Sequence, residues 1–102
     1  MTDMLSAHSN SSRTERLKIL LTMQLAAEHV EVIDDSARHE GHAGARSEGE
    51  THYTVVVVSS RFEGVSRVAR SRLVHEIVAR EFAAGMHALS LVLRSPAEHR
   101  LT

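Results

Sequence analysis

Four consecutive valines, Val55–Val58, constrain the fold of this chain more than any other stretch of it. Their β-branched side chains favour an extended backbone over a helix. A strand with one solvated face alternates apolar and polar residues, whereas an unbroken apolar run is typical of a strand covered on both faces or central in its sheet. The sequence therefore predicts a central strand within residues 51–60.

Three segments precede this strand. Ser12 and Glu15 have the spacing of a capping box, and leucines at helical spacing follow as far as Leu25, which predicts a helix ending near Ala27. Apolar and polar residues alternate over 29–34 (HVEVID), which predicts a first strand. The turn formers Asp34 to Ser36 end it. Residues 37–50 hold three of the five glycines and show no apolar periodicity, so we expect a long mobile loop there.

Helices and a last strand follow. Residues 65–84 carry a wide apolar face, with a break expected near Arg70 to Arg72, and Gly85 suits a helix C-terminus. Leucines two residues apart predict a strand over 86–94, which Pro96 ends, and we expect the remaining residues to fray. A helical crossover implies that the last two strands are parallel, whereas the first two can be antiparallel. The predicted fold is α+β, in the order α-β-β-α-α-β, with a three-stranded mixed sheet and helices on one face.

Composition excludes several classes of function. The chain has no cysteine, which rules out disulfides, thiolate nucleophiles and cysteine metal ligands within it. A net charge of -1 provides no overall attraction to nucleic acid or membranes, and three aromatic residues (one Tyr and two Phe) are few for base stacking. No apolar run approaches the roughly 20 residues of a membrane span, and residues 1–10 do not resemble a secretory signal. Neither a phosphate loop nor HExxH occurs, so we expect no enzyme.

Two groups of residues could carry a function. Eight histidines are many for this length, and each could be a surface group, a hydrogen-bonded group or a metal ligand. Residues 61–72 carry four arginines against one glutamate, a local charge of +3. These arginines could form a solvated helix face, bind carboxylates or contact DNA phosphates. The residues concerned are Arg61, Arg67, Arg70 and Arg72.

An ordered set of short motifs from about Arg16 to Pro96 resembles the BolA family, and most closely its BolA1-like branch with a histidine-type loop. The motifs are EVIDDS (31–36), GHA (41–43), ETHY (50–53), VVVVS (55–59), RFEG (61–64), RSRLVH (70–75) and HALSL (87–91). The resemblance implies a class II KH-like fold and a role in iron–sulfur cluster assembly. Two departures stand out: Ser71 replaces a histidine frequent in the family, and Gly64 to Arg67 lacks the second glycine of the KH loop.

The resemblance also implies a partner and a site. BolA-like proteins pair with monothiol glutaredoxins of the CGFS type and share a bridging [2Fe–2S] cluster, to which the glutaredoxin and glutathione supply sulfur. The positions that match the BolA ligands are His87 and His42, with His39 as the alternative loop ligand. Two imidazoles on one iron occur in Rieske centres. Under this hypothesis the arginines would bind the glutaredoxin or glutathione, whereas DNA-binding transcriptional regulation is the alternative.

These observations define the expected organisation of the chain. We expect a disordered N-terminal tail (1–11), a BolA-like domain (12–96) and a C-terminal tail (97–102). The free chain is expected to be a monomer or weak homodimer in the cytoplasm, or in the mitochondrial matrix of a eukaryotic cell.

Overall fold

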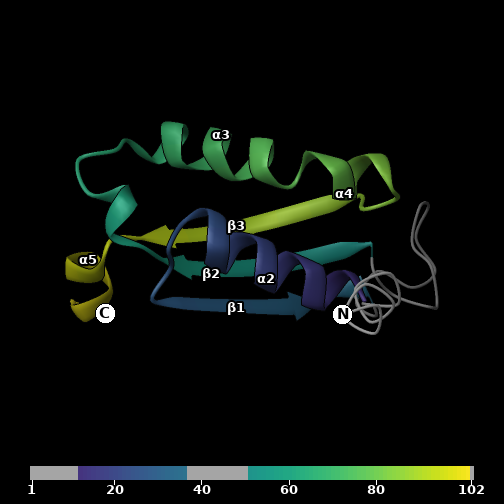
Figure 1. Cartoon of the computed structure of the whole chain (residues 1–102), viewed down its shortest axis with the longest axis horizontal. Helices are drawn as coiled ribbons and strands as arrows, with labels where there is room; N and C mark the ends of the chain where they lie inside the picture. The colour runs from purple at the N-terminus through teal and green to yellow at the C-terminus, as the bar shows by residue number, and fades with distance from the viewer. Residues whose placement is uncertain (1–11, 37–50, 102) are drawn as a thin grey trace, which may run out of the picture.

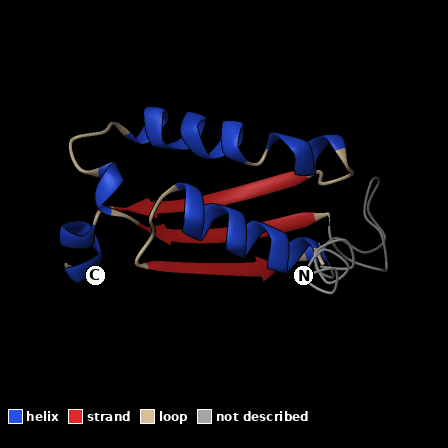
Figure 2. Cartoon of the chain, viewed as in Figure 1, coloured by secondary structure: helices blue, strands red, loops and turns tan. Residues whose placement is uncertain are grey.

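The computed structural model describes residues 12–36 and 51–101, which form one layer of helices packed on a three-stranded sheet (Figures 1 and 2). The elements, in chain order, are α2 (Arg13–Gln24), β1 (His29–Asp34), β2 (His52–Val58), a 3₁₀ helix (Ser60–Phe62), α3 (Arg67–Ile77), α4 (Ala79–Ala83), β3 (Ala88–Arg94) and α5 (Pro96–Arg100).

The valine strand β2 lies in the middle of the sheet, whose order is β1-β2-β3. It pairs antiparallel with β1, with Val30 opposite Val57, and parallel with β3, with Val55 opposite Leu91. The predicted central strand, the two strand directions and the α+β class are therefore confirmed.

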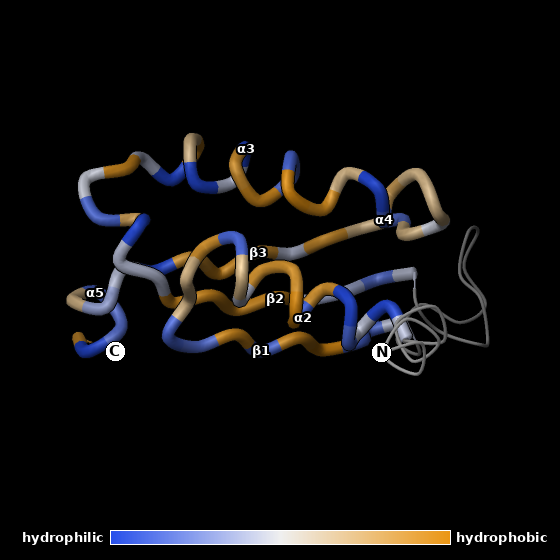
Figure 3. Tube along the Cα trace, in the orientation of Figure 1, coloured by the Kyte–Doolittle hydropathy of each residue, from blue (hydrophilic) through white to orange (hydrophobic). Residues whose placement is uncertain are grey.

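The hydrophobic core lies between one face of the sheet and the helices. Val55 and Val57 of β2 are fully buried on that face, together with Leu17 and Leu21 of α2. Val74 of α3 and Val78 complete the same cluster. Figure 3 shows hydrophobic residues, in orange, along the strands and in stretches of α2 and α3. Since all helices that contribute to this cluster pack on the same face, the predicted one-sided arrangement is correct.

Local sequence signals set the helix starts. The Ser12 side chain accepts a hydrogen bond from the Glu15 N–H at 3.2 Å, as the capping spacing predicts. Ser66 caps α3 in the same way through the Ala69 N–H at 3.1 Å. Both caps satisfy amides that the first helical turn leaves unpaired.

Two expectations about helices were wrong. The break in the second helical region lies at Val78, not near Arg70 to Arg72. The bend there keeps Val78 buried while α4 brings Glu81 against Arg13 of α2, at 2.8 Å. The residues after Pro96 do not fray but form α5, which begins with a capping box between Ser95 and Glu98.

In the described residues, no helix combines the length and the hydropathy that crossing a membrane would require.

Candidate functional site

His87 stands at the start of β3, at the end of the sheet where residues 37–50 leave β1 and rejoin β2. Its side chain is exposed. The backbone holds its position, because the His87 N–H donates to the Thr51 carbonyl at 2.7 Å and the Ala88 N–H donates to the same oxygen at 3.1 Å. An exposed imidazole is thus carried on a fixed backbone.

The two ends of segment 37–50 are tied together beside His87. The hydroxyl oxygen of Ser36 accepts hydrogen bonds from the backbone N–H of Thr51 at 2.9 Å and of His52 at 3.1 Å. Ser36 and Thr51 are both buried. Segment 37–50 therefore begins directly after Ser36 and ends directly before Thr51. These two residues are hydrogen-bonded to each other, and the Thr51 carbonyl holds the backbone of His87. The loop candidates His39 and His42 lie outside the described residues.

A second imidazole lies next to His87. The rings of His52 and His87 are 5.9 Å apart between centroids and meet edge to face at 83°. The Nδ1 atom of His52 is 2.9 Å from the Thr51 hydroxyl oxygen. The parallel register, which sets His52 opposite Ala88, brings the two rings together.

The described residues do not by themselves form a metal centre. Among residues 12–36 and 51–101, no three histidine, aspartate or glutamate side chains are grouped as metal ligands would be. The chain also has no cysteine. A cluster held at His87 would need ligands from outside this part of the chain.

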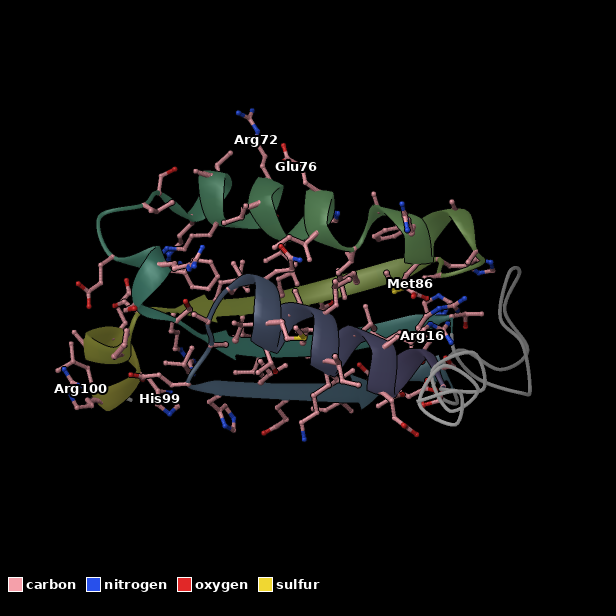
Figure 4. All side chains as sticks on the ribbon, viewed as in Figure 1. Arg16, Arg72, Glu76, Met86, His99 and Arg100 are labelled. Atoms are coloured by element: carbon pink, nitrogen blue, oxygen red, sulfur yellow. The ribbon has the colours of Figure 1, made fainter. Side chains whose placement is uncertain are left out.

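A buried ion-pair network, which no pattern in the sequence indicated, supports the turn that carries His87. Glu81 of α4 accepts from Arg13 Nε at 2.8 Å and from Arg16 Nε at 2.9 Å. Arg13 also donates to the Ala84 carbonyl at 3.0 Å, next to Gly85 with its φ of +119°. Hydrogen bonds from Arg16 and Arg13 lower the pKa of Glu81 although burial opposes them. Figure 4 labels Arg16 and Met86 at this end of the molecule.

The four arginines of residues 61–72 do not form one surface. Arg70 is buried, and its guanidinium donates to the Val65 carbonyl at 2.8 Å, the Leu93 carbonyl at 3.1 Å and Glu98 at 2.6 Å. It also lies 5.6 Å from the Phe62 ring centroid. Arg61, Arg67 and Arg72 are exposed, and Arg72 points away from the sheet (Figure 4). Arg70 is therefore a structural residue in this fold.

The remaining described histidines stack on aromatic rings other than His87. His75 of α3 is stacked on Phe82, with 5.6 Å between ring centroids. His29 of β1 is stacked on His99 of α5 at 6.0 Å. Aromatic contacts of this kind are typical of packing and do not indicate a site.

Comparison with known proteins identifies the family. The model of the family described as BolA-like protein matches residues 21–98. BolA-like protein 1 from Mus musculus is 42% identical over 84 residues, which cover 82% of this chain and 58% of that protein. Protein BOLA1, chloroplastic, from Arabidopsis thaliana is 39% identical over 89 residues, 85% of this chain and 56% of the relative. The chain thus spans less than two thirds of either relative.

A solved structure agrees with the sequence relatives. The BolA domain of SufE1 from Arabidopsis thaliana superposes with a TM-score of 0.77 at 40% identity, covering 86% of this chain and 96% of that domain. The chain belongs to the BolA-like family.

Proposed function

We propose that this protein is a non-catalytic adaptor in iron–sulfur cluster assembly or trafficking, which binds a CGFS-type monothiol glutaredoxin and co-ligates a bridging [2Fe–2S] cluster. His87 and one histidine of segment 37–50 would be its ligands. His42 is our first choice on that segment, and His39 is the alternative.

One observation carries the proposal: the exposed His87 side chain stands where segment 37–50 is anchored at both ends. His42 follows Ser36 by six positions, a span of at most about 22 Å. The length of chain after Ser36 therefore allows either histidine candidate to reach His87. If segment 37–50 were anchored far from His87, its histidines could not bind the same iron atom as His87.

The donors that the chain offers are compatible with a shared cluster. Imidazole nitrogen ligates iron in place of thiolate, and two such ligands raise the reduction potential. This chain contains no cysteine, so the remaining sulfur ligands would come from the glutaredoxin and glutathione. When bound, the cluster would supply a transferable iron–sulfur unit. The residues of this chain would orient His87 through Thr51 and hold the Gly85 turn through Arg13.

The DNA-binding alternative gains no support from the positions of the arginines. Arg70, the central member of the group, directs its donors to groups inside the protein. Arg61, Arg67 and Arg72 remain exposed. They could contribute long-range attraction to an acidic partner, such as a glutaredoxin surface, without forming a base-reading set. We therefore propose no transcriptional role.

Mixing the protein with a CGFS glutaredoxin, glutathione and cluster tests the proposal, with visible circular dichroism as the measurement. We expect His87→Ala to abolish the spectrum of the mixed complex, or to weaken complex formation by about tenfold or more. One of His42→Ala and His39→Ala should have a comparable effect. His75→Ala is the matched control, because His75 is an exposed histidine that packs on Phe82 of the helical layer.

Acidification gives a second measurement. The iron ligands must be neutral imidazoles, and the ordinary histidine pKa is about 6.5, so complex formation should weaken progressively below that pH. A complex spectrum that His87→Ala leaves unchanged would refute the ligand assignment. We propose the cytoplasm, or the mitochondrial matrix in a eukaryotic cell, as the compartment; the Arabidopsis relative is named as chloroplastic.

A further inference from the structure

Strand β3 is an edge of the sheet, and its hydrogen-bonding pattern shows which backbone groups face outward. The Ala88 N–H donates to Thr51 of the β2 side, and the Arg94 carbonyl accepts from Ser59 at 3.0 Å on that same side. Backbone groups alternate in direction along a strand. The N–H and C=O groups of Leu89, Leu91 and Leu93 therefore point away from β2.

Only one end of this outer edge is closed. The Leu93 carbonyl accepts from the Arg70 guanidinium at 3.1 Å. In the described part of the chain, no hydrogen bond from another element reaches the outward groups of Leu89 or Leu91. An open strand edge is a template for pairing with another extended chain. Arg70 would end such pairing at Leu93.

A groove of about 580 Å³ runs along this edge between α3, β3 and α5. Its lining includes Leu91 and Leu93, which are partly buried, and Leu101, which is 87% exposed. The open edge offers backbone hydrogen-bond partners to an added strand. The apolar side chains beside the edge offer contacts for alternate side chains of that strand.

The charge of the groove selects the kind of partner. Arg70 and Glu98 neutralise each other at 2.6 Å. Arg67 and Arg94 also line the groove, and among the described residues neither has an ion-pair partner. The groove thus carries two uncompensated positive charges beside an apolar floor. Acidic groups on a bound segment would complement them.

We propose that the β3 edge is a docking site for an extended segment of a partner protein in which apolar and acidic residues alternate. The segment adds a fourth strand next to β3, with acidic side chains toward Arg67 and Arg94. This surface lies along β3 and α5, whereas His87 stands at the start of β3. The proposal is therefore independent of the cluster-binding function.

Two other occupants fit the groove less well. Single-stranded nucleic acid binds through aromatic stacking platforms, and the groove lining contains no aromatic side chain among the described residues. A second copy of this chain, paired edge to edge, would bring two grooves of the same positive charge together, which like-charge repulsion disfavours.

Fluorescence anisotropy with a labelled synthetic peptide of alternating valine and glutamate tests the site. We expect micromolar binding that weakens as salt is added. Two further peptides carry N-methyl groups on all valines or on all glutamates. Since alternate residues of an added strand face β3, only one of these two peptides should lose binding. Equal behaviour of both N-methylated peptides would overturn edge pairing.

Protein variants locate the binding surface. The double variant Arg67→Gln/Arg94→Gln should weaken peptide binding by about tenfold, because it removes both proposed ion pairs with the acidic residues of the peptide. Arg80→Gln is the control, because Arg80 is an exposed arginine of α4 that does not line this groove. Circular dichroism should show that all variants remain folded.

Three further results would refute the proposal. The first is equal peptide binding by the double variant and the unchanged protein. The second is tighter binding of oligothymidylate than of the peptide, which would indicate a nucleic-acid groove. The third is a dimer in sedimentation experiments that the peptide cannot dissociate, which would indicate that a second copy occupies the edge.

Discussion

Arg70 and His87, at opposite ends of the sheet, use their side chains in opposite ways. At the end formed by the C-termini of β2 and β3, Arg70 is buried. Its guanidinium donates hydrogen bonds to the Val65 and Leu93 carbonyls and to Glu98. At the other end, where β3 begins, His87 has a fixed backbone and an exposed ring. Figure 1 shows α5 at the first end and the start of β3 at the second.

The difference separates stability from function in this small domain. A buried guanidinium must be satisfied internally, since an unpaired buried charge is strongly destabilising. An exposed imidazole has no such requirement and remains available to an external ligand. Arg70 is therefore expected to contribute mainly to folding stability, and His87 is expected to contribute to what the protein binds.

The largest effect should come from Arg70→Met. This change leaves the Leu93 and Val65 carbonyls and Glu98 without their donor, so we expect the free energy of unfolding to fall by about 2–4 kcal/mol. Urea denaturation measures the loss. Arg72→Met, on the exposed side of the same helix, is the control and should change stability by less than about 0.5 kcal/mol. Equal losses in both variants would remove the contrast between the two ends.

A smaller, pH-dependent effect is expected from Glu98. The hydrogen bond from Arg70, with that from the Ser95 backbone, lowers the pKa of Glu98 from 4.5 to about 2. A lowered carboxyl pKa stabilises the fold above the unfolded-state value and loses that contribution as pH falls. The stability difference between the unchanged protein and Glu98→Gln should therefore shrink as pH falls from about 4.5 to about 2.

Denaturation at several pH values measures this difference, and Glu76→Gln is the matched control, because Glu76 points away from the sheet on α3 (Figure 4). NMR signals of α5 should shift over the same pH range. A difference that stays constant down to pH 2 would mean that the Arg70 pair does not hold α5 in solution.

The sequence was sufficient to predict those helices and strands that are specified by neighbouring residues. The valine run predicted β2, the cap at Ser12 predicted the start of α2, and the crossover predicted parallel pairing with β3. α5 was missed although Ser95 and Glu98 have capping-box spacing, because five residues are too few for apolar periodicity. Its stability also comes from Arg70, 28 positions earlier in the chain.

The site was less predictable than the fold because its contacts are long-range. The partners of Arg70 lie on three separate segments, so no spacing in the sequence indicates its burial. The approach of His52 to His87 could have been found from the parallel register, which sets position 52 opposite 88. His39 and His42 stay predictions, since they fall outside the described residues.

The smallest effect on stability is expected at the proposed ligand itself. The His87 side chain is exposed and meets His52 only edge to face, so His87→Ala should change the free energy of unfolding by less than about 0.5 kcal/mol. His75→Ala should cost slightly more, about 0.5–1 kcal/mol, because its ring is stacked on Phe82. Chemical denaturation of both variants checks the order. If His87→Ala were the more destabilising change, the imidazole would be part of the structural framework, and loss of cluster binding in that variant could no longer be assigned to a lost ligand.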